Sequence, residues 1–421
     1  MRYKGHVVWL SQGRICFSDK VATFSVAQFV SAAEKIQNLS SDKVVLDFRF
    51  VEKAYPNGML PIIALTNDLS AKGFTVEVLL PEKQNPRSLF VASNWAHLLD
   101  PVQYRPSEST HNRHLVSQYF TNAVEQKASV DKFMDVVLRN MEINRSALAG
   151  LEWSINEITD NVLNHAEARL GGIVQASTYP SQQLIGFTVV DAGRGILKSL
   201  REGYPSLKTD EQAIGEAIKA GVTRNSRFGQ GNGLAGTLRI TNLSGGSFDI
   251  SSGRSRFVIT SNETKRYNQY PNESFPGTIV GGQISTAMSF DMSDALSFGT
   301  RYPYQSVDII ENQYELEDER CLAIRLRNET TGFGSRHSGK QMRQKAENLL
   351  AAEPTYPLVL DWSGVPVISS SFADEFVGKL FLSMGAITFS ARLRNRNMEP
   401  LIVGLLDKAI AQRLTQEADP H

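Results

Sequence analysis

An apolar stripe near the middle of the chain restricts the fold more than any other feature of the sequence. Its members recur at steps of three and four residues: Leu148, Leu151, Ile155, Ile158 and Val162. This spacing predicts an amphipathic helix that buries one face in a core. Glu157 and Asn161 are four residues apart and therefore lie one turn apart on a neighbouring face. A carboxylate beside an amide can orient a water molecule and hold a metal ion, although such pairs also occur on ordinary solvated helices.

Three glycine-containing motifs follow this helix in a fixed order. An apolar run ends in Asp191-Ala-Gly193-Arg-Gly195, then comes Gly229-Gln-Gly231-Asn-Gly233-Leu234, and Gly277-Thr278 opens another apolar run. Together with Glu157-x-x-x-Asn161, this order resembles the GHKL ATP-binding fold, the superfamily of gyrase-type, chaperone-type, histidine-kinase and mismatch-repair ATPases. The resemblance covers residues 146–289, and the order and spacing of the four motifs make it specific.

The resemblance implies how a nucleotide base would be held. Asp191 would accept a hydrogen bond from the amino group of adenine, and Gly193 and Gly195 would let the backbone approach the base and ribose. Thr278 would add a hydroxyl or water contact to adenine. The alternatives are a strand-to-turn motif without a ligand and, for Thr278, an ordinary β-branched strand residue.

The resemblance also implies a site for the phosphates. Gly229, Gly231 and Gly233 would supply backbone N–H groups to phosphate oxygens, and a helix over Leu234–Thr241 would direct its positive end at them. The polar stretch Lys198–Arg227 occupies the position of the ATP lid, and Arg227 would lie near the triphosphate. Asn161 would be a ligand of Mg²⁺, and Glu157 would act as the catalytic general base.

Both ends of the chain predict α/β domains, so the expected fold class is a central α/β sandwich, with helices on one face of a mixed sheet, between two flanking α/β domains. We expect boundaries at 1–103, 104–145, 146–289 and 296–421, the second being a linker with a lead-in helix over Val130–Met141. The stretch Tyr104–Lys127 has no clear periodicity, Ser261–Ser274 reads as a polar loop, and Pro86–Leu99 and Ile387–Leu393 as a helix and a strand. Val44–Val51 and Leu358–Val365 match in residue type at most positions, which indicates two related domains unless common βαβ patterns coincide.

The segment that begins at Leu358 resembles the STAS-like domain found beside bacterial GHKL modules. In partner-switching STAS proteins, a serine in the turn before a helix is phosphorylated by a GHKL kinase, and the matching residues here are Ser370 and Ser371. The alternative role for a serine in this turn is a helix N-cap, which the following Asp374 and Glu375 favour because they would repel a phosphate. The first domain has Tyr55-Pro-Asn-Gly at the equivalent place, so we interpret it as a degenerate STAS-like module without a phosphoacceptor.

The charge balance, the cysteines and the lack of long apolar runs argue against several classes of function. Lys plus Arg and Asp plus Glu both number 44, so nothing predicts attraction to nucleic acid or to an anionic membrane. The two cysteines, Cys16 and Cys321, are expected to be reduced core residues. The sequence has no secretory signal and no apolar run long enough for a membrane span, which predicts a cytoplasmic protein.

Three functions fit these observations. The first is a regulatory Mg-ATP-binding ATPase whose nucleotide state controls how STAS-like domains or a protein partner dock. The second is a serine protein kinase of the anti-sigma-factor type, acting on Ser370 or Ser371 or on a STAS-like protein in trans. The third is a non-enzymatic scaffold that nucleotide stabilises. The resemblance also implies a homodimer, since many GHKL ATPases dimerise through or near the ATP domain.

Overall fold

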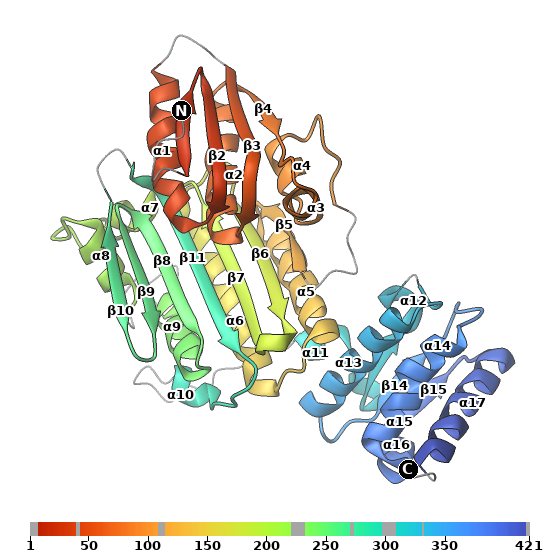
Figure 1. Cartoon of the computed structure of the whole chain (residues 1–421). Coiled ribbons are helices and arrows are strands. Elements are labelled where there is room, and N and C mark those ends of the chain that lie inside the picture. The colour runs from red at the N-terminus through yellow and green to blue at the C-terminus, as the bar shows by residue number, and fades with distance from the viewer. Residues whose placement is uncertain are drawn as a thin grey trace. The chain divides into compact units, whose positions relative to one another are not determined.

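The computed structural model describes residues 7–38, 43–107, 114–219, 232–269, 273–296, 309–330 and 332–417. The chain divides into two compact units. The first comprises Met1–Phe133 and Gly150–Tyr304, and the second comprises Met134–Ala149 and Gln305–His421. Both units combine helices with sheets, which confirms the α/β class (Figure 1).

The first unit begins with a small sheet whose strands follow the order β1-β2-β3-β4. The strands are β1 (Val8–Ser11), β2 (Arg14–Val21), β3 (Lys43–Ala54) and β4 (Thr75–Leu79), and the helices are α1 (Thr23–Gln37), α2 (Pro56–Ala71), α3 (Gln84–Ala92) and α4 (Trp95–Leu99). Strands β1 and β2 form an antiparallel hairpin, whereas β2, β3 and β4 pair in parallel. The helix predicted over Pro86–Leu99 is interrupted, because Asn94 adopts a left-handed conformation with φ of 67°.

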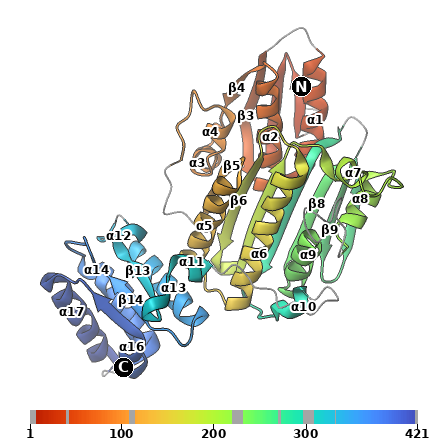
Figure 2. The ribbon, with the colours of Figure 1, turned by 180° about the vertical axis from the view of Figure 1, so that it is seen from behind.

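The larger sheet of this unit has the strand order β10-β9-β8-β11-β7-β6-β5, and all neighbouring strands are antiparallel, so the central sheet is not mixed as predicted. Its strands are β5 (His114–Phe120), β6 (Gly172–Tyr179), β7 (Leu184–Asp191), β8 (Ser247–Gly253), β9 (Ser255–Thr260), β10 (Thr264–Asn268) and β11 (Phe275–Ser285). Its helices are α5 (Ala123–Asn140), α6 (Arg145–Asn161) with the π-helical turn η1 (Val162–Ala166), the 3-10 turn η2 (Pro180–Gln182), α7 (Gly195–Leu200), α8 (Asp210–Ala217), α9 (Gly233–Leu243) and α10 (Met292–Leu296). Figure 2 shows α6 and α9 on one face of the sheet.

Two polar stretches in this unit contain strands that the sequence did not predict. Strand β5 lies inside Tyr104–Lys127 and pairs with β6 at one edge of the sheet. Strand β10 lies inside Ser261–Ser274, pairs with β9 at the other edge, and is exposed along its whole length. An edge strand that is exposed to solvent on both faces has no apolar alternation, which explains why β10 resembles a loop in sequence.

The small sheet and the large sheet share a hydrophobic core. Helix α2 is buried over Gly58–Thr66, and the buried cluster around it includes Ile173, Val190, Phe275 and Ile279 of the large sheet. Polar bonds join the same surfaces: Trp95 Nε1 donates to Gln175 Oε1 at 2.8 Å, and Asn67 Nδ2 donates to the Tyr119 hydroxyl at 2.6 Å. The small α/β domain is therefore packed on the large sheet as part of one folded body.

The second unit contains a sheet with the order β12-β13-β14-β15. Its strands are β12 (Glu315–Leu316), β13 (Cys321–Arg325), β14 (Leu358–Asp361) and β15 (Leu393–Arg396). Its helices and helical turns are α11 (Ile309–Gln313), η4 (Glu317–Glu319), α12 (Leu326–Glu329), α13 (Arg336–Ala352), α14 (Ser370–Ala373), η5 (Asp374–Gly378), α15 (Lys379–Met384), α16 (Ala386–Arg392) and α17 (Pro400–Glu417). As in the small N-terminal sheet, the first pair of strands is antiparallel and the next two pairs are parallel.

The strand predicted over Ile387–Leu393 is wrong, because these residues form helix α16 and the strand begins only at Leu393. Gly385, with φ of 74°, ends one helix and precedes the next. The ring of Phe389 then packs on Phe381 at 5.2 Å between centroids. This tertiary contact outweighs the strand preference of the β-branched and aromatic residues in the segment.

A buried charge cluster joins Met134–Ala149 to the rest of the second unit. The side chain of Lys345 is fully buried, and its ammonium group binds Asp135 at 2.6 Å and also Glu329. Arg139 binds the same two carboxylates at 2.8 and 2.7 Å. Burial alone would raise the pKa of Asp135, but the charges of Lys345 and Arg139 outweigh it and hold that pKa below its usual value.

Both cysteines are free and buried, as expected of core residues. In the part of the chain that the structure covers, no helix is both long and apolar enough to cross a membrane.

Candidate functional site

The predicted apolar stripe forms the buried face of α6. Leu148, Leu151, Ile155, Ile158 and Val162 are all under 10 % exposed. Glu157 and Asn161 lie on the neighbouring, half-buried face, as the periodicity predicts. Burial, reinforced by the negative charge of Asp160, raises the pKa of Glu157 to about 7.

The first residue of α9 lies directly against this face. A Cβ atom added to Gly233 would be 2.6 Å from Oε2 of Glu157 and 3.3 Å from Nδ2 of Asn161. The structure thus brings together residues that are more than 70 positions apart in sequence, and the absence of a side chain at Gly233 permits the close approach. Helix α9 starts one residue before its predicted beginning, and Leu234 is half-buried in its first turn.

Asp191 is the centre of a second cluster. It ends β7 and is 4 % exposed, and its carboxylate accepts the Gly193 N–H at 2.8 Å as well as the backbone N–H and the hydroxyl of Thr278. Burial raises the pKa of Asp191 to about 6, and these hydrogen bonds act in the opposite direction. Asp191 and Thr278 face each other across paired strands, so their side chains lie on the same face of the sheet.

The turn after Asp191 requires its glycines. Gly195 has φ of 74°, a conformation that side chains with a Cβ disfavour. A Cβ atom on Gly193 would lie 2.1 Å from the backbone oxygen of Ala166. The glycines of this motif therefore allow the backbone of η1 to lie against the turn after Asp191.

The two clusters are joined by the end of the helix that carries Glu157 and Asn161. Helix α6 continues into η1, and the carbonyl of Ala166 accepts the Arg194 backbone N–H at 2.8 Å. The Arg194 guanidinium donates to the carbonyl of His165 and forms ion pairs with Glu167 and Glu202. We call this set of Arg194 interactions the Arg194 clamp. The sequence motif contained Arg194, but its spacing did not predict these interactions.

Several predicted site residues lie outside the described residues. Arg227, Gly229 and Gly231 fall in 220–231. The lid expected over Lys198–Arg227 is described only as far as residue 219, and this part contains the end of α7 and the whole of α8. The described half of the candidate phosphate site therefore consists of Glu157, Asn161 and Gly233.

Among the described residues, no three His, Cys, Asp or Glu side chains gather closely enough to hold a metal ion. Mg²⁺ typically uses one or two protein ligands together with phosphates and water, so the Asn161 amide fits an ion that arrives with a nucleotide.

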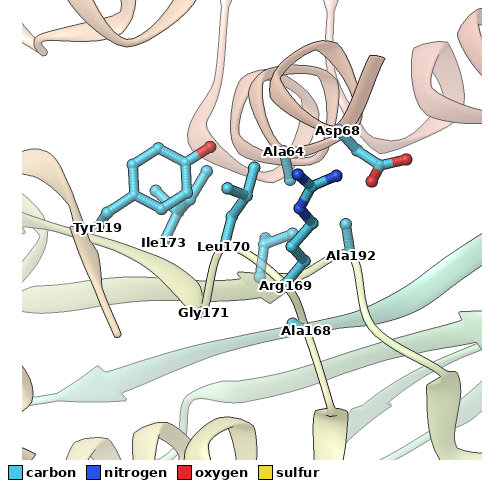
Figure 3. A pocket seen from close by; sticks show the side chains of 10 residues that line it. Ala64, Asp68, Tyr119, Ala168, Arg169, Leu170, Gly171, Ile173 and Ala192 are labelled. Atoms are coloured by element: carbon cyan, nitrogen blue, oxygen red, sulfur yellow. The ribbon is translucent and has the colours of Figure 1, made fainter. Parts of the chain in front are cut away.

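The cavity in Figure 3 lies elsewhere. It is lined by residues of α2, β5, β6 and β7, of the loop before β6 and of the turn after β7: Ala64, Asp68, Tyr119, Ala168, Arg169, Leu170, Gly171, Ile173, Val190 and Ala192. Its volume of about 10 Å³ has room for roughly one water molecule. A nucleotide cannot bind in this cavity.

The candidate phosphoacceptor serines lie in the first turn of α14. Ser369 is the N-cap, because its hydroxyl accepts the Phe372 N–H at 3.0 Å, and Ser370 and Ser371 are exposed. The capping role predicted for a serine of this turn therefore belongs to Ser369.

The acidic residues after these serines are paired with cations. Asp374 binds Arg413 at 2.7 Å and Arg336 at 3.4 Å, and Glu375 binds Lys379 at 2.7 Å. The Arg413 hydrogen bond holds the pKa of Asp374 below its usual value despite partial burial. The repulsion that these carboxylates would exert on a phosphate is consequently reduced.

Comparison with known families identifies one segment of the chain. Residues 338–402 match the STAS-like domain of unknown function (DUF4325), which confirms the resemblance predicted for the C-terminal region. The matched segment extends from α13 to the start of α17 and includes Ser370 and Ser371. No curated protein and no solved structure matches the chain.

Proposed function

We propose that the central domain binds Mg²⁺-ATP in the manner of a GHKL ATPase, and that its nucleotide state controls docking of the STAS-like domain or of a protein partner. The observation that carries this proposal is the Asp191 carboxylate, which is buried, accepts hydrogen bonds from Gly193 in the turn after β7 and from Thr278 on β11, and is joined through η1 to the helix bearing Glu157 and Asn161.

The chemistry of Asp191 suits adenine. Adenine presents an amino donor where guanine presents a carbonyl acceptor, so an ionised carboxylate at this position selects adenine. A hydrogen bond to a charged group contributes about 1.5–3 kcal/mol, which corresponds to a preference of roughly 10- to 150-fold. Thr278 lies beside Asp191 and can contact the same edge of the base.

The chemistry around Glu157 suits the phosphates. The N-terminus of α9 offers backbone N–H groups and a positive dipole end beside Asn161. Mg²⁺ on Asn161 would neutralise charge on the phosphate oxygens, and Glu157 would take a proton from the attacking water. Hydrolysis would return the domain to its unloaded state.

Removal of the proposed Mg²⁺ ligand is expected to abolish nucleotide binding. For the wild type, Mg²⁺-ATP at about 100 times its Kd should raise the free energy of unfolding by about 2.7 kcal/mol and the melting temperature with it. Asn161→Ala should show no such shift, whereas Asn164→Ala, an exposed position on the same helical segment, should retain it. A wild type without an ATP-dependent shift would refute the proposed function.

Gly233→Ala is expected to impair turnover without unfolding the domain. The new methyl group would displace the Glu157 carboxylate, because it would lie 2.6 Å from Oε2. We expect at least a tenfold lower rate, since a small displacement of a catalytic group costs up to about 100-fold. Gly215→Ala in α8 is the control, since its Cβ would meet no atom within 4 Å; equal rates for the two variants would contradict the assigned contact.

A serine protein kinase is the second candidate function. It is favoured by the exposure of Ser370 and Ser371 next to a capping serine, and by the cation pairs that neutralise Asp374 and Glu375. After incubation with Mg²⁺-ATP, intact mass should show added phosphate in the wild type and in Ser369→Ala. The double variant Ser370→Ala/Ser371→Ala should show none, and an unmodified wild type would remove the reaction in cis.

A further inference from the structure

Ser252 occupies a position that the nucleotide motifs do not include. It lies on β8, is 2 % exposed, and faces Thr278 of β11, which in turn faces Asp191 of β7. Residues that are directly opposite on neighbouring strands point to the same face of a sheet. Ser252, Thr278 and Asp191 therefore form one row across the candidate base site.

The hydroxyl of Ser252 links the two segments that flank this row. It accepts the Ile196 N–H at 2.9 Å and donates to the carbonyl of Gly277 at 3.0 Å. The pairing of β11 with β8 is irregular between Phe275 and Thr278, so the ladder does not pair the Gly277 carbonyl with β8. Ser252 supplies a hydrogen bond there.

The absence of a side chain at Gly195 leaves room for the same hydroxyl. A Cβ atom on Gly195 would lie 3.0 Å from Oγ of Ser252 and 3.5 Å from the carbonyl oxygen of Gly277. The turn after Asp191 and the strand that begins at Gly277 thus meet at Ser252, and one buried hydroxyl fixes their separation.

We infer that Ser252 is a positioning residue for base recognition: it holds the Gly195–Ile196 turn against Gly277–Thr278 so that Asp191 and Thr278 meet adenine together. This inference rests on the proposed function. Without the hydroxyl, the Ile196 N–H and the Gly277 carbonyl lose a buried partner, which costs about 1–3 kcal/mol for each group unless the two segments move. Movement of these segments would separate Thr278 from Asp191.

The neighbouring Ser251 provides a matched control. It lies on the same strand, is 8 % exposed and faces Ile279, so its side chain points to the opposite face of the sheet. Within the described residues its hydroxyl has no hydrogen-bond partner. Ser251→Ala removes the same atom from the same strand without touching the base site.

The test compares the two alanine variants in the full chain by titration with a nonhydrolysable ATP analogue and with its guanine counterpart, both with Mg²⁺. We expect Ser252→Ala to weaken binding of the adenine analogue about tenfold or more and to reduce the preference over guanine, whereas Ser251→Ala changes neither. Ser252→Thr, which keeps the hydroxyl, should restore the preference. A second readout needs no nucleotide: hydrogen exchange of the Ile196 amide should accelerate only in Ser252→Ala.

The outcomes separate the inference from the proposed function. A wild type that binds neither analogue overturns both. A wild type that binds the adenine analogue while Ser252→Ala and Ser251→Ala have equal affinity, equal base preference and equal exchange at Ile196 overturns the role of Ser252 alone. A loss of thermal stability in Ser252→Ala with unchanged base preference also overturns it, because a purely structural role predicts that result.

Discussion

Glu157→Gln should lower the rate of ATP hydrolysis about 10²- to 10⁴-fold while ATP binding is retained. Glutamine keeps the size of the side chain and its place beside Gly233, but it cannot accept a proton. The expected effect is large because the proposed role of Glu157 is that of the general base, and its carboxylate lies against the start of α9 in the candidate phosphate site. Phosphate release and nucleotide affinity, measured on the same preparation, separate catalysis from binding.

The pH dependence of the wild type should report the same group. Burial raises the pKa of Glu157 to about 7, and a general base acts only when it is ionised. The value of kcat/KM should therefore rise as the pH increases through about 7 and level off above it. Asp160→Asn removes a neighbouring negative charge, so it should lower the pKa of Glu157 and move the rise to lower pH.

The control for Glu157→Gln is Glu142→Gln, which makes the same chemical change at an exposed position. It should leave both the rate and the pH profile unaltered. If Glu157→Gln hydrolyses ATP as fast as Glu142→Gln does, Glu157 is not the base and the catalytic role assigned to it is wrong.

Lys345→Met should destabilise the second unit by about 3–5 kcal/mol, the typical cost of leaving buried charges without their partner. Methionine fills a similar volume, so the loss is electrostatic rather than a cavity effect. Asp135 and Glu329 would then share Arg139 as their remaining cation in this cluster. Urea denaturation followed by the hydrogen exchange of amides within the second unit measures this loss.

Two further variants test whether this loss comes from the uncompensated carboxylates. Lys340→Met, an exposed position on the same helix, should change the unfolding free energy by less than about 0.5 kcal/mol. Adding Glu329→Gln to Lys345→Met removes one of the uncompensated carboxylates and should recover part of the loss. Equal stability of Lys345→Met and Lys340→Met would contradict the energetic role of the cluster.

Helical periodicity predicted α6 well because its signal is local. Five apolar residues at regular spacing suffice to place a helix, orient it and bring Glu157 and Asn161 to one face. The same reasoning missed β5 and β10, because edge strands gain their structure from a partner strand and not from their own alternation. It assigned α16 wrongly because the contact of Phe389 with Phe381 depends on the fold of the whole unit.

The sequence of α2 itself indicates that this helix is covered on more than one side. The N-terminal part of α2 is apolar on all sides over Gly58–Leu65, and Gly58–Thr66 is buried without a break. A helix that is hydrophobic all round must be covered on more than one side. This pattern distinguishes α2 from a helix of a free-standing domain, and the structure shows that the large sheet supplies the second cover.

The candidate site, too, could be predicted from the sequence only in part. Each motif residue could be named from sequence because the motifs are short and ordered, and the described ones form two clusters around the end of α6. Ser252 and the Arg194 clamp could not be predicted, because they depend on the register of β8 against β11 and on the close approach of η1 to the turn after Asp191. The irregular register of β8 against β11 depends on contacts between segments that are far apart in the sequence.

Calorimetric titration of the wild-type chain with a nonhydrolysable ATP analogue in Mg²⁺, repeated with the guanine counterpart and with Asp191→Ala, tests the nucleotide site most directly. We expect one analogue bound per chain, at least tenfold weaker binding of the guanine form, and loss of that preference in Asp191→Ala. Absence of binding heat for the adenine analogue, or equal affinity for both bases in the wild type, would contradict the site built around Asp191.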